Sequence, residues 1–368
     1  MNRLRGVVYP YDIESAYFFR YDYFNKDFQV VGAVSPPGWG LHGNDVLGVC
    51  KEKHCGIEVV KSFNEVDEDF DTVILVDSYN DLDFNTYIFP KVKEILQEKK
   101  NLICTKILDN ESKMALKKLC ESIGVIFKYY NNETYNSNII KGELYDINVP
   151  VIFIMSIASR TNKFDIQLTL KRDLGEMGYR TSIIGSKNHG EVFGMHNFPN
   201  FMFDDQIRES KKILMFNRLV KEIEKNENPD AIIIGVPEGI MPIGKVLNNN
   251  FGIIPYLVCN AVKPDTTILS LLYTKNYDKE YFEEVERVLK YKFDCNIDCY
   301  NLSNIFYDYQ ESENNNSTIY TIIDSDFIDF KKDKYKSSKP IFNILNIEDG
   351  KSMSKYITNI LSNGEEII

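Results

Sequence analysis

One stretch of this chain restricts its fold more than any other: an apolar strand that runs into a polar turn and then into a helix opened by a lysine. The stretch covers residues 151–165 and reads VIFIMSIASRTNKFD. A strand, a turn and a helix that begins near Lys163 form the layout of a phosphate-binding P-loop, in which backbone N–H groups curl around phosphate oxygens. The sequence therefore predicts a P-loop-like unit at this point.

The turn departs from the P-loop motif G-x-x-x-x-G-K-[ST] at three positions. Ile157 and Asn162 stand where the motif has glycine, and Phe164 stands where it has the hydroxyl that holds Mg²⁺. The nearest hydroxyls are those of Thr161 and Thr169. Residues other than glycine adopt the required left-handed dihedrals less readily. We therefore expect a degenerate P-loop that still holds an anion but turns over nucleotide at a negligible rate.

Length and composition are those of a folded protein with two domains. The 368 residues exceed the size of about 250–300 residues at which a single core stops growing. A net charge of −11 argues against nucleic-acid binding, because phosphate backbones require clustered Lys and Arg. The chain has no run of about 18 apolar residues, and its N-terminus lacks the apolar core of a secretion signal. We expect a cytoplasmic protein without nucleic-acid or membrane partners. The sequence leaves both a monomer and a homo-oligomer as alternatives.

The cysteines predict free thiols. There are seven, an odd number, and they are widely scattered. The closest pairs, Cys50/Cys55 and Cys295/Cys299, do not form a C-x-x-C motif, and a structural zinc ion needs four converging ligands. We predict neither a disulfide framework nor a metal site.

A second group of polar residues lies in the loop after the predicted strand 181–184. His189, Glu191 and His196 are followed there by the pair Asp204-Asp205. Their spacing matches no metal-ligand pattern, so a plain polar loop is the favoured interpretation. Since loops at this position of a P-loop domain are switch-like, we interpret residues 186–196 as a mobile, functional loop.

Residues 1–145 alternate between strands and helices, which is typical of βαβ units and a parallel sheet. This half is predicted to be a Rossmann-like domain over residues 1–145, and its last residues belong to a polar linker predicted over residues 131–148. The predicted strands cover residues 6–9, 30–34, 72–77, 102–105 and 125–127, and the predicted helices cover 12–24, 90–99 and 112–123.

The segment Gly38–Gly43, GWGLHG, matches the dinucleotide fingerprint G-x-G-x-x-G. That fingerprint requires the glycines to lie between a strand and the helix that it feeds. Here Pro36-Pro37 intervenes, and the segment follows the second strand instead of the first. We therefore predict a surface turn that presents Trp39, and a dinucleotide site in this half remains an alternative.

The second half is predicted to hold a degenerate P-loop NTPase-like α/β domain over residues 146–312 and a small C-terminal α/β extension over 313–368. Residues 311–317, ESENNNS, are interpreted as a low-complexity break. The first predicted strand begins at residue 151, and the other predicted strands cover residues 181–184, 230–236, 254–259, 267–272, 319–323 and 341–347. The predicted helices cover residues 164–177, 205–225, 278–292 and 352–361.

Glu238 is the candidate acidic residue of the P-loop domain. It follows the apolar strand 230–236, and in P-loop proteins the carboxylate that orders Mg²⁺ or water lies at the end of such a strand. A solvated turn carboxylate is the alternative. We predict that Lys163, Asn162, Thr161 and Glu238 form the nucleotide or anion site, with ATP or GTP and magnesium as candidate ligands.

Three segments carry a resemblance to a known family: residues 151–185, 229–242 (PDAIIIGVPEGIMP) and 260–265 (NAVKPD). They resemble the clostridial peptide maturation system proteins, which accompany Cys-rich ribosomal peptides and a radical-SAM maturase. That family resembles in turn two-domain proteins with a Rossmann-like half and a P-loop domain of the dethiobiotin-synthetase-like branch. The resemblance covers about residues 1–310 and implies that Lys163 and Glu238 are nucleotide-site positions.

Two functions of different classes follow from these patterns. The first is an accessory protein in the maturation of a ribosomally made peptide, which binds the precursor peptide or the radical-SAM maturase and keeps a vestigial anion site. The alternative is an enzyme of the P-loop class that uses ATP or GTP to act on a carboxylate or a peptide. No catalytic residue is assigned.

Overall fold

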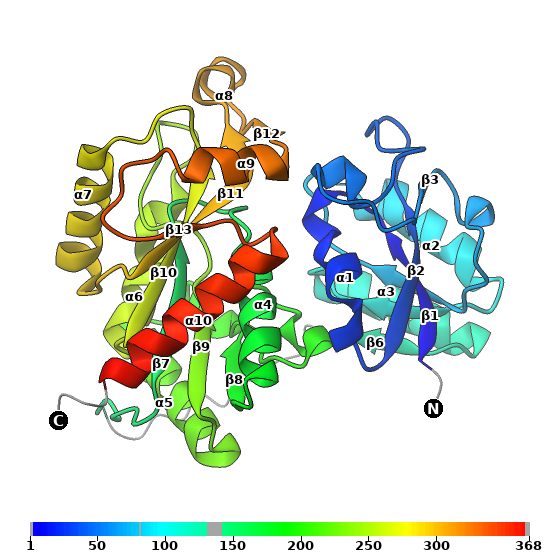
Figure 1. The fold of residues 1–368 in the computed structure, drawn as a ribbon. Helices are drawn as coiled ribbons and strands as arrows, with labels where there is room; N and C mark the ends of the chain where they lie inside the picture. The colour runs from blue at the N-terminus through cyan, green and yellow to red at the C-terminus, as the bar shows by residue number, and fades with distance from the viewer. Residues whose placement is uncertain (1–2, 81, 131–141, 365–368) are drawn as a thin grey trace. The chain divides into compact units, whose positions relative to one another are not determined.

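A computed structural model describes residues 3–80, 82–130 and 142–364 of the chain (Figure 1). The chain forms two compact units. Unit 1 is Met1–Asn132 together with Glu191–Gly194, and unit 2 is Glu133–Gly190 with Met195–Ile368. Residues 131–141 of the predicted linker lie outside the described residues. Each unit is built on an open, mainly parallel sheet, as the sequence predicts.

Unit 1 holds a six-stranded parallel sheet in the order β3-β2-β1-β4-β5-β6. This is the strand order of a Rossmann domain, so the predicted fold of the first half is confirmed. The strands are β1 (Leu4–Tyr9), β2 (Phe28–Val34), β3 (Val59–Val60), β4 (Thr72–Leu75), β5 (Asn101–Cys104) and β6 (Phe127–Tyr129), and the α-helices are α1 (Tyr17–Arg20), α2 (Phe89–Leu96) and α3 (Asn110–Ile123).

The single helix predicted over residues 12–24 is wrong in its length. The segment forms two short 3₁₀ turns, Ile13–Ser15 and Asp22–Phe24, on either side of the four-residue helix α1. Its second part, residues 17–24, is mostly aromatic, and aromatic side chains form helices poorly because they lose rotamer freedom there. They pack individually instead: the ring of Phe18 contacts those of Phe28 and Phe193.

Unit 2 holds a seven-stranded sheet in the order β12-β11-β10-β7-β9-β8, with β13 paired to β11. All of its pairs are parallel except that of β11 with the edge strand β12. The strands are β7 (Val151–Ser156), β8 (Thr181–Ile184), β9 (Ala231–Gly235), β10 (Thr266–Tyr273), β11 (Cys299–Tyr307), β12 (Tyr320–Ile322) and β13 (Ile341–Phe342).

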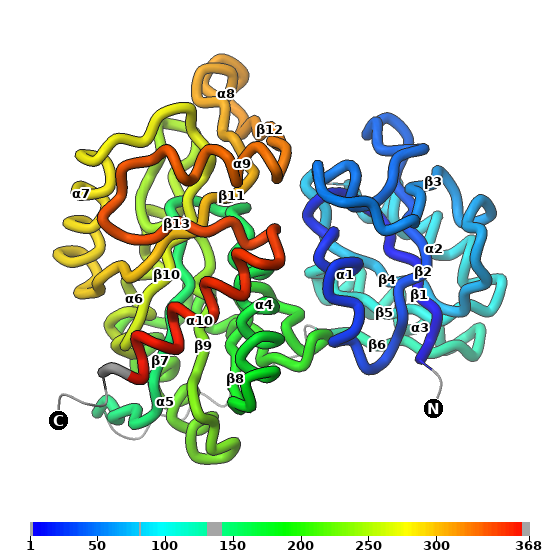
Figure 2. Tube along the Cα trace, viewed as in Figure 1, coloured from blue at the N-terminus to red at the C-terminus, as the bar shows by residue number. Residues whose placement is uncertain are grey.

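Helices cover both faces of this sheet, so its central strands are buried along their whole length (Figures 1 and 2). Apolar residues of α5, α6 and α7 share one core with alternate residues of β7 such as Phe153 and Met155. The helices α4 and α10 contact each other and pack on the sheet. The helices are α4 (Lys163–Glu176), α5 (Glu209–Glu227), α6 (Ile253–Ala261), α7 (Lys279–Val288), α8 (Tyr309–Asn315), α9 (Ser325–Lys332) and α10 (Ile347–Gly364).

Several elements of unit 2 differ from the prediction. The apolar run 254–259 is helix α6, because a short apolar run has no periodicity that separates a buried helix from a strand. The predicted break 311–317 lies mostly in helix α8, which Asp308 caps by accepting a hydrogen bond from the Glu311 amide at 3.0 Å. No element was predicted for β11 or α9. The residues from 313 onward contribute β12 and β13 to the main sheet of unit 2.

Candidate functional site

The candidate site lies at the carboxyl end of β7, the strand between β9 and β10 in the sheet of unit 2. The chain turns there through residues 157–162 and enters α4 at Lys163. Arg160 and Asn162 both have left-handed backbone angles, with φ of 63° and 61°. Asn162 therefore takes the backbone conformation that glycine takes in the motif, and asparagine is among the residues that tolerate it best.

The hydrogen bonds of this loop are asymmetric. Several of its carbonyl groups accept hydrogen bonds inside the protein: the Ile157 oxygen accepts one from Asn249 Nδ2 at 2.9 Å, and the Ala158 oxygen accepts one from Ser156 Oγ at 2.6 Å. In the described part of the chain, no acceptor faces the backbone amides of Ala158, Ser159, Thr161 and Asn162. A turn with successive unpaired N–H groups at the start of a helix is an anion-binding concavity.

Lys163 is buried, and its ammonium group faces the end of β9. Nζ donates hydrogen bonds to the carbonyl oxygen of Val236, at 2.8 Å, and to that of Glu238. Burial lowers the pKa of Lys163 to about 7, although the Glu238 carboxylate acts in the opposite direction. Near neutral pH this lysine is therefore close to the midpoint of its titration.

Glu238 lies directly beyond β9 in a turn with a left-handed φ of 62°. Burial raises the pKa of its carboxyl group. Its Oε2 is buried and has no hydrogen-bond partner among the residues that the structure describes. The turn and the loop are packed together, since Ser156 Oγ, which donates to the Ala158 carbonyl, also lies 3.0 Å from the Glu238 carbonyl oxygen, and a Cβ at Gly239 would lie 2.5 Å from the Ile157 carbonyl oxygen.

The residues fit a magnesium ion only in part. Magnesium bound with a nucleotide keeps several waters and takes phosphate oxygens and one or two carboxylates. The unpartnered oxygen of Glu238 is such a ligand. Phe164 supplies no hydroxyl and packs against the His189 ring at 5.8 Å, while the Thr161 hydroxyl donates to the Ala158 carbonyl at 3.3 Å.

The histidines of the 186–196 loop do not converge. Burial and Lys187 lower the pKa of His189 to about 3, so its ring is neutral. His196 Nε2 lies 2.6 Å from an oxygen of Glu227 on α5. Across residues 3–80, 82–130 and 142–364, no three His, Cys, Asp or Glu side chains are grouped as they would be around a metal ion.

A cavity of about 640 Å³ begins beside the loop at Ile157. It lies at the carboxyl ends of β10 and β11, the edge where open α/β sheets bind ligands. Much of its lining is aromatic: Tyr273, Tyr277, Tyr281, Phe306, Tyr307 and Tyr309. The volume falls in the range of small-molecule sites.

In unit 1, the turn that follows the first strand contains a carboxylate that already accepts backbone amides. The first strand, β1, leads to Asp12, whose carboxylate accepts hydrogen bonds from the backbone amides of Glu14, at 2.9 Å, and Tyr79. The G-x-G-x-x-G segment lies elsewhere: it forms a turn after β2, in which Gly38, Gly40 and Gly43 have positive φ. It does not join a strand directly to a helix.

Sequence reasoning missed the residues that shape the P-loop-like turn from a distance. Asn249, Ser270 and Asn301 all donate hydrogen bonds to carbonyl groups of the loop. They lie about 90 to 140 positions along the chain from their partners, and Asn301 lies on the unpredicted strand β11. No motif marks them, so no local signal in the sequence could have found them.

No protein-family model matches the sequence, and no curated protein matches it. Among solved structures, a DUF1611 family protein from Anabaena variabilis aligns with a TM-score of 0.57 and 12% identity, over 85% of this chain and 91% of its own. This similarity supports the two-domain α/β fold.

Two structures of cobyrinic acid a,c-diamide synthase from Mycobacterium smegmatis align less closely. One has bound ADP and magnesium, with a TM-score of 0.35 and 11% identity over 59% of this chain and 96% of that chain. The other has a bound ATP analog and magnesium, with a TM-score of 0.36 and 11% identity over 59% of this chain and 97% of that chain.

No helix among the described residues is both long and apolar enough to span a membrane.

Proposed function

We propose that unit 2 binds the phosphates of a nucleotide, ATP or GTP with magnesium, and that the protein is a P-loop-class enzyme acting on a carboxylate or peptide substrate. The observation that carries the proposal is the loop 157–162, in which the carbonyl groups of Ile157, Ala158 and Thr161 accept hydrogen bonds within the protein while four backbone amides lack acceptors. Lys163 adds a cation at the N-terminus of α4, where the helix dipole also favours anions.

Each residue of the site has a distinct role in this proposal. The loop amides bind phosphate oxygens, and Lys163 exchanges its two carbonyl partners for a phosphate oxygen. The anion then raises the pKa of Lys163 and keeps the ammonium charged. The Glu238 carboxylate would hold a magnesium ion, which would neutralise phosphate charge. The aromatic cavity beside Ile157 has room for the remainder of the nucleotide or for the second substrate.

Calorimetric titration of the full chain with Mg-ATP, Mg-GTP and NAD tests this proposal. We expect one of the two nucleoside triphosphates to bind, and Lys163→Met to weaken that binding about 10- to 100-fold, because a hydrogen bond to a charged group contributes about 1.5–3 kcal/mol. Lys290→Met is the matched control, since Lys290 is an exposed lysine of the same unit. Equal affinities of wild type and Lys163→Met would contradict the proposed site.

An accessory role in peptide maturation is the second candidate, and Phe164 is the observation that favours it. Without a hydroxyl at this position the site holds magnesium less firmly, and catalysis of phosphoryl transfer depends on ordered magnesium. In this case the protein binds a precursor peptide or a radical-SAM maturase, as the sequence resemblance implies. Turnover separates the two candidates: a rate of about 1 s⁻¹ or more that Glu238→Gln abolishes supports the enzyme, and nucleotide binding without turnover supports the accessory role.

A further inference from the structure

We propose that Ser270 and Asn301 are positioning residues that aim the amide of Asn162 outward, toward an anion, and that a polar network of the C-terminal segment holds Asn301 in place. This inference rests on the proposed phosphate site. It assigns roles to two strands, β10 and β11, that carry no recognisable nucleotide-binding motif.

The first observation is the way in which Ser270 holds both ends of the loop. Its backbone carbonyl accepts the Ile157 amide at 3.1 Å, and its Oγ donates to the Thr161 carbonyl. Asn301 adds a second donor, since its Nδ2 lies 2.8 Å from Ser270 Oγ and 3.4 Å from the Thr161 oxygen. Ser270 and Asn301 are register partners on adjacent strands and are fully buried.

The geometry of the peptide bond gives these contacts their consequence. The carbonyl of Thr161 and the amide of Asn162 belong to one peptide unit, and in a trans peptide the C=O and N–H groups point in opposite directions. Two buried donors that hold the Thr161 oxygen on the sheet side therefore turn the Asn162 N–H away from the sheet. If this peptide unit rotated, the loop would present a carbonyl oxygen where an anion should bind.

The second observation fixes the orientation of the Asn301 side chain. Its Oδ1 accepts the backbone amide of Ile344 at 2.9 Å, so its Nδ2 must face Ser270 and Thr161. If the side-chain amide of Asn301 were rotated by half a turn, its NH₂ group would face the Ile344 N–H and its oxygen would face the Thr161 carbonyl oxygen.

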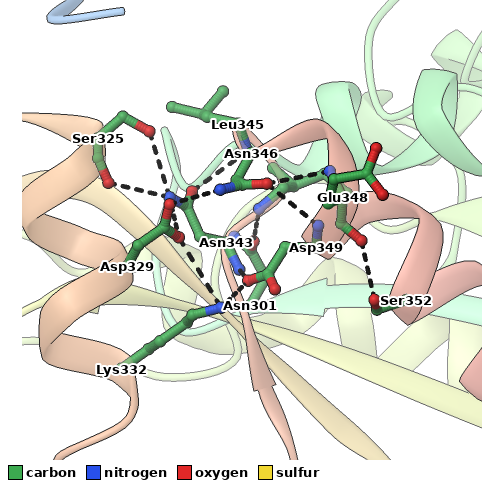
Figure 3. A network of polar contacts seen from close by, with 11 residues as sticks. Asn301, Ser325, Asp329, Lys332, Asn343, Leu345, Asn346, Glu348, Asp349 and Ser352 are labelled. Carbon is green, nitrogen blue, oxygen red and sulfur yellow. Dashed lines mark hydrogen bonds and ion pairs between the residues drawn. The ribbon is translucent and has the colours of Figure 1, made fainter.

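A polar network in turn holds the chain around Ile344 (Figure 3). Asn343 Nδ2 donates to Asp329 Oδ1 at 2.9 Å and to the Ser325 carbonyl at 3.1 Å, while the Asn343 amide donates to Asp349 Oδ2 at 2.8 Å. Lys332 pairs with Asp349 between these groups. The network joins α9, the segment that follows β13 and the start of α10, and Asn301 is its link to the loop 157–162.

The experiment compares two buried hydroxyls on β10. Ser270→Ala removes a donor to the loop, whereas Thr267→Val, the matched control, removes a hydroxyl that has no partner among the described residues. Full-length variants are titrated with Mg-ATP and with inorganic pyrophosphate. We expect Ser270→Ala to weaken both ligands about fivefold to tenfold and Thr267→Val to stay within about twofold, because a single neutral hydrogen bond contributes about 1 kcal/mol.

A second measurement does not depend on ligand binding. Amide NMR spectra of the ligand-free variants should show altered signals for Thr161, Asn162 and Lys163 in Ser270→Ala and unchanged ones in Thr267→Val. Asn301→Asp, which keeps the acceptor for Ile344 but removes the donor to Thr161, should alter the same signals. Unaltered loop signals in both variants would overturn the positioning role. If wild type binds neither ligand but these signals move, only the proposed function fails.

Discussion

The two units share a sheet architecture but differ in the turn that follows the first strand. In unit 1 this turn carries Asp12, an internal anion whose carboxylate already accepts amides of neighbouring residues. In unit 2 the turn has no acidic side chain between Ser156 and Lys163, and four of its amides face no acceptor in the described chain. A parallel sheet thus provides the place for a phosphate site, and the local turn decides whether a phosphate can enter it.

The helices that follow the two turns reinforce this contrast. In unit 1 Asp12 leads into a 3₁₀ turn of three residues and then the four-residue helix α1. In unit 2 the loop leads into α4, which is 14 residues long and begins with a lysine. A long helix presents a fuller dipole and several unpaired amides to an anion, whereas a single turn does not. Unit 1 therefore lacks, after its first strand, the long helix N-terminus on which the dinucleotide fingerprint places the pyrophosphate.

The largest expected effect on stability comes from Lys163→Met. Folded Lys163 has a pKa of about 7, below its ordinary 10.5, so the unfolded chain binds more protons between these values and wild-type stability rises with pH there. Lys163→Met removes this buried charge and also leaves the carbonyl groups of Val236 and Glu238 without their donor, so its free energy of unfolding relative to wild type should be higher at pH 6 than at pH 10 by about 1–4 kcal/mol. This relative gain should shrink toward pH 10. Urea unfolding across this range measures it, and a gain independent of pH would contradict the buried titration.

Gly239→Ala should destabilise the site by about 1–3 kcal/mol, because the new Cβ would overlap the backbone oxygen of Ile157. Gly175→Ala on α4 is the matched control, since its Cβ would meet open space and alanine favours helices over glycine by about 1 kcal/mol. Thermal unfolding should therefore move in opposite directions for the two variants. Equal melting temperatures would show that the loop and the Glu238 turn are not packed as described.

Binding of Mg-ATP should weaken with rising pH, by about tenfold per pH unit once the pH exceeds the pKa that Lys163 has in the ligand-free protein. The reason is that the anion binds the protonated ammonium, which is the minor form above pH 7 in the ligand-free protein. Lys163→Arg should remove this dependence, since arginine stays charged. Titrations at pH 6.5, 7.5 and 8.5 give the slope, and a flat wild-type profile would argue that Lys163 does not touch the phosphates.

Asn162→Gly should have the smallest effect, within about 1 kcal/mol in stability and with unchanged affinity, because glycine adopts the same left-handed angle without strain. Asn162→Val should be less stable and should bind phosphate more weakly than both wild type and Asn162→Gly, since a β-branched side chain at positive φ is strongly disfavoured. Wild-type phosphate affinity in Asn162→Gly together with weaker phosphate binding in Asn162→Val would support the loop conformation. Equal affinity for Asn162→Val would contradict it.

The sequence predicted what short-range patterns can encode. The bounds of β8 agree with the prediction. The helix α4 begins one residue earlier than expected, and the helical spacing of its apolar residues is what predicted it. The shape of the loop lies beyond such patterns. The left-handed angle of Asn162 is held by Ser270 and Asn301, which approach only in the folded sheet. Departures from the glycine motif suggested a damaged loop, while tertiary hydrogen bonds preserve its backbone.

The most direct test is a pyrophosphate titration of isotope-labelled protein, followed through its backbone amide signals. If unit 2 carries the phosphate site, the amide signals of Ala158, Ser159, Thr161 and Asn162 shift together with one dissociation constant, while those of Glu14 and Tyr79 around Asp12 stay in place. Shifts confined to the turn at Asp12, or none in residues 158–162, would contradict the claim that unit 2 carries the phosphate site.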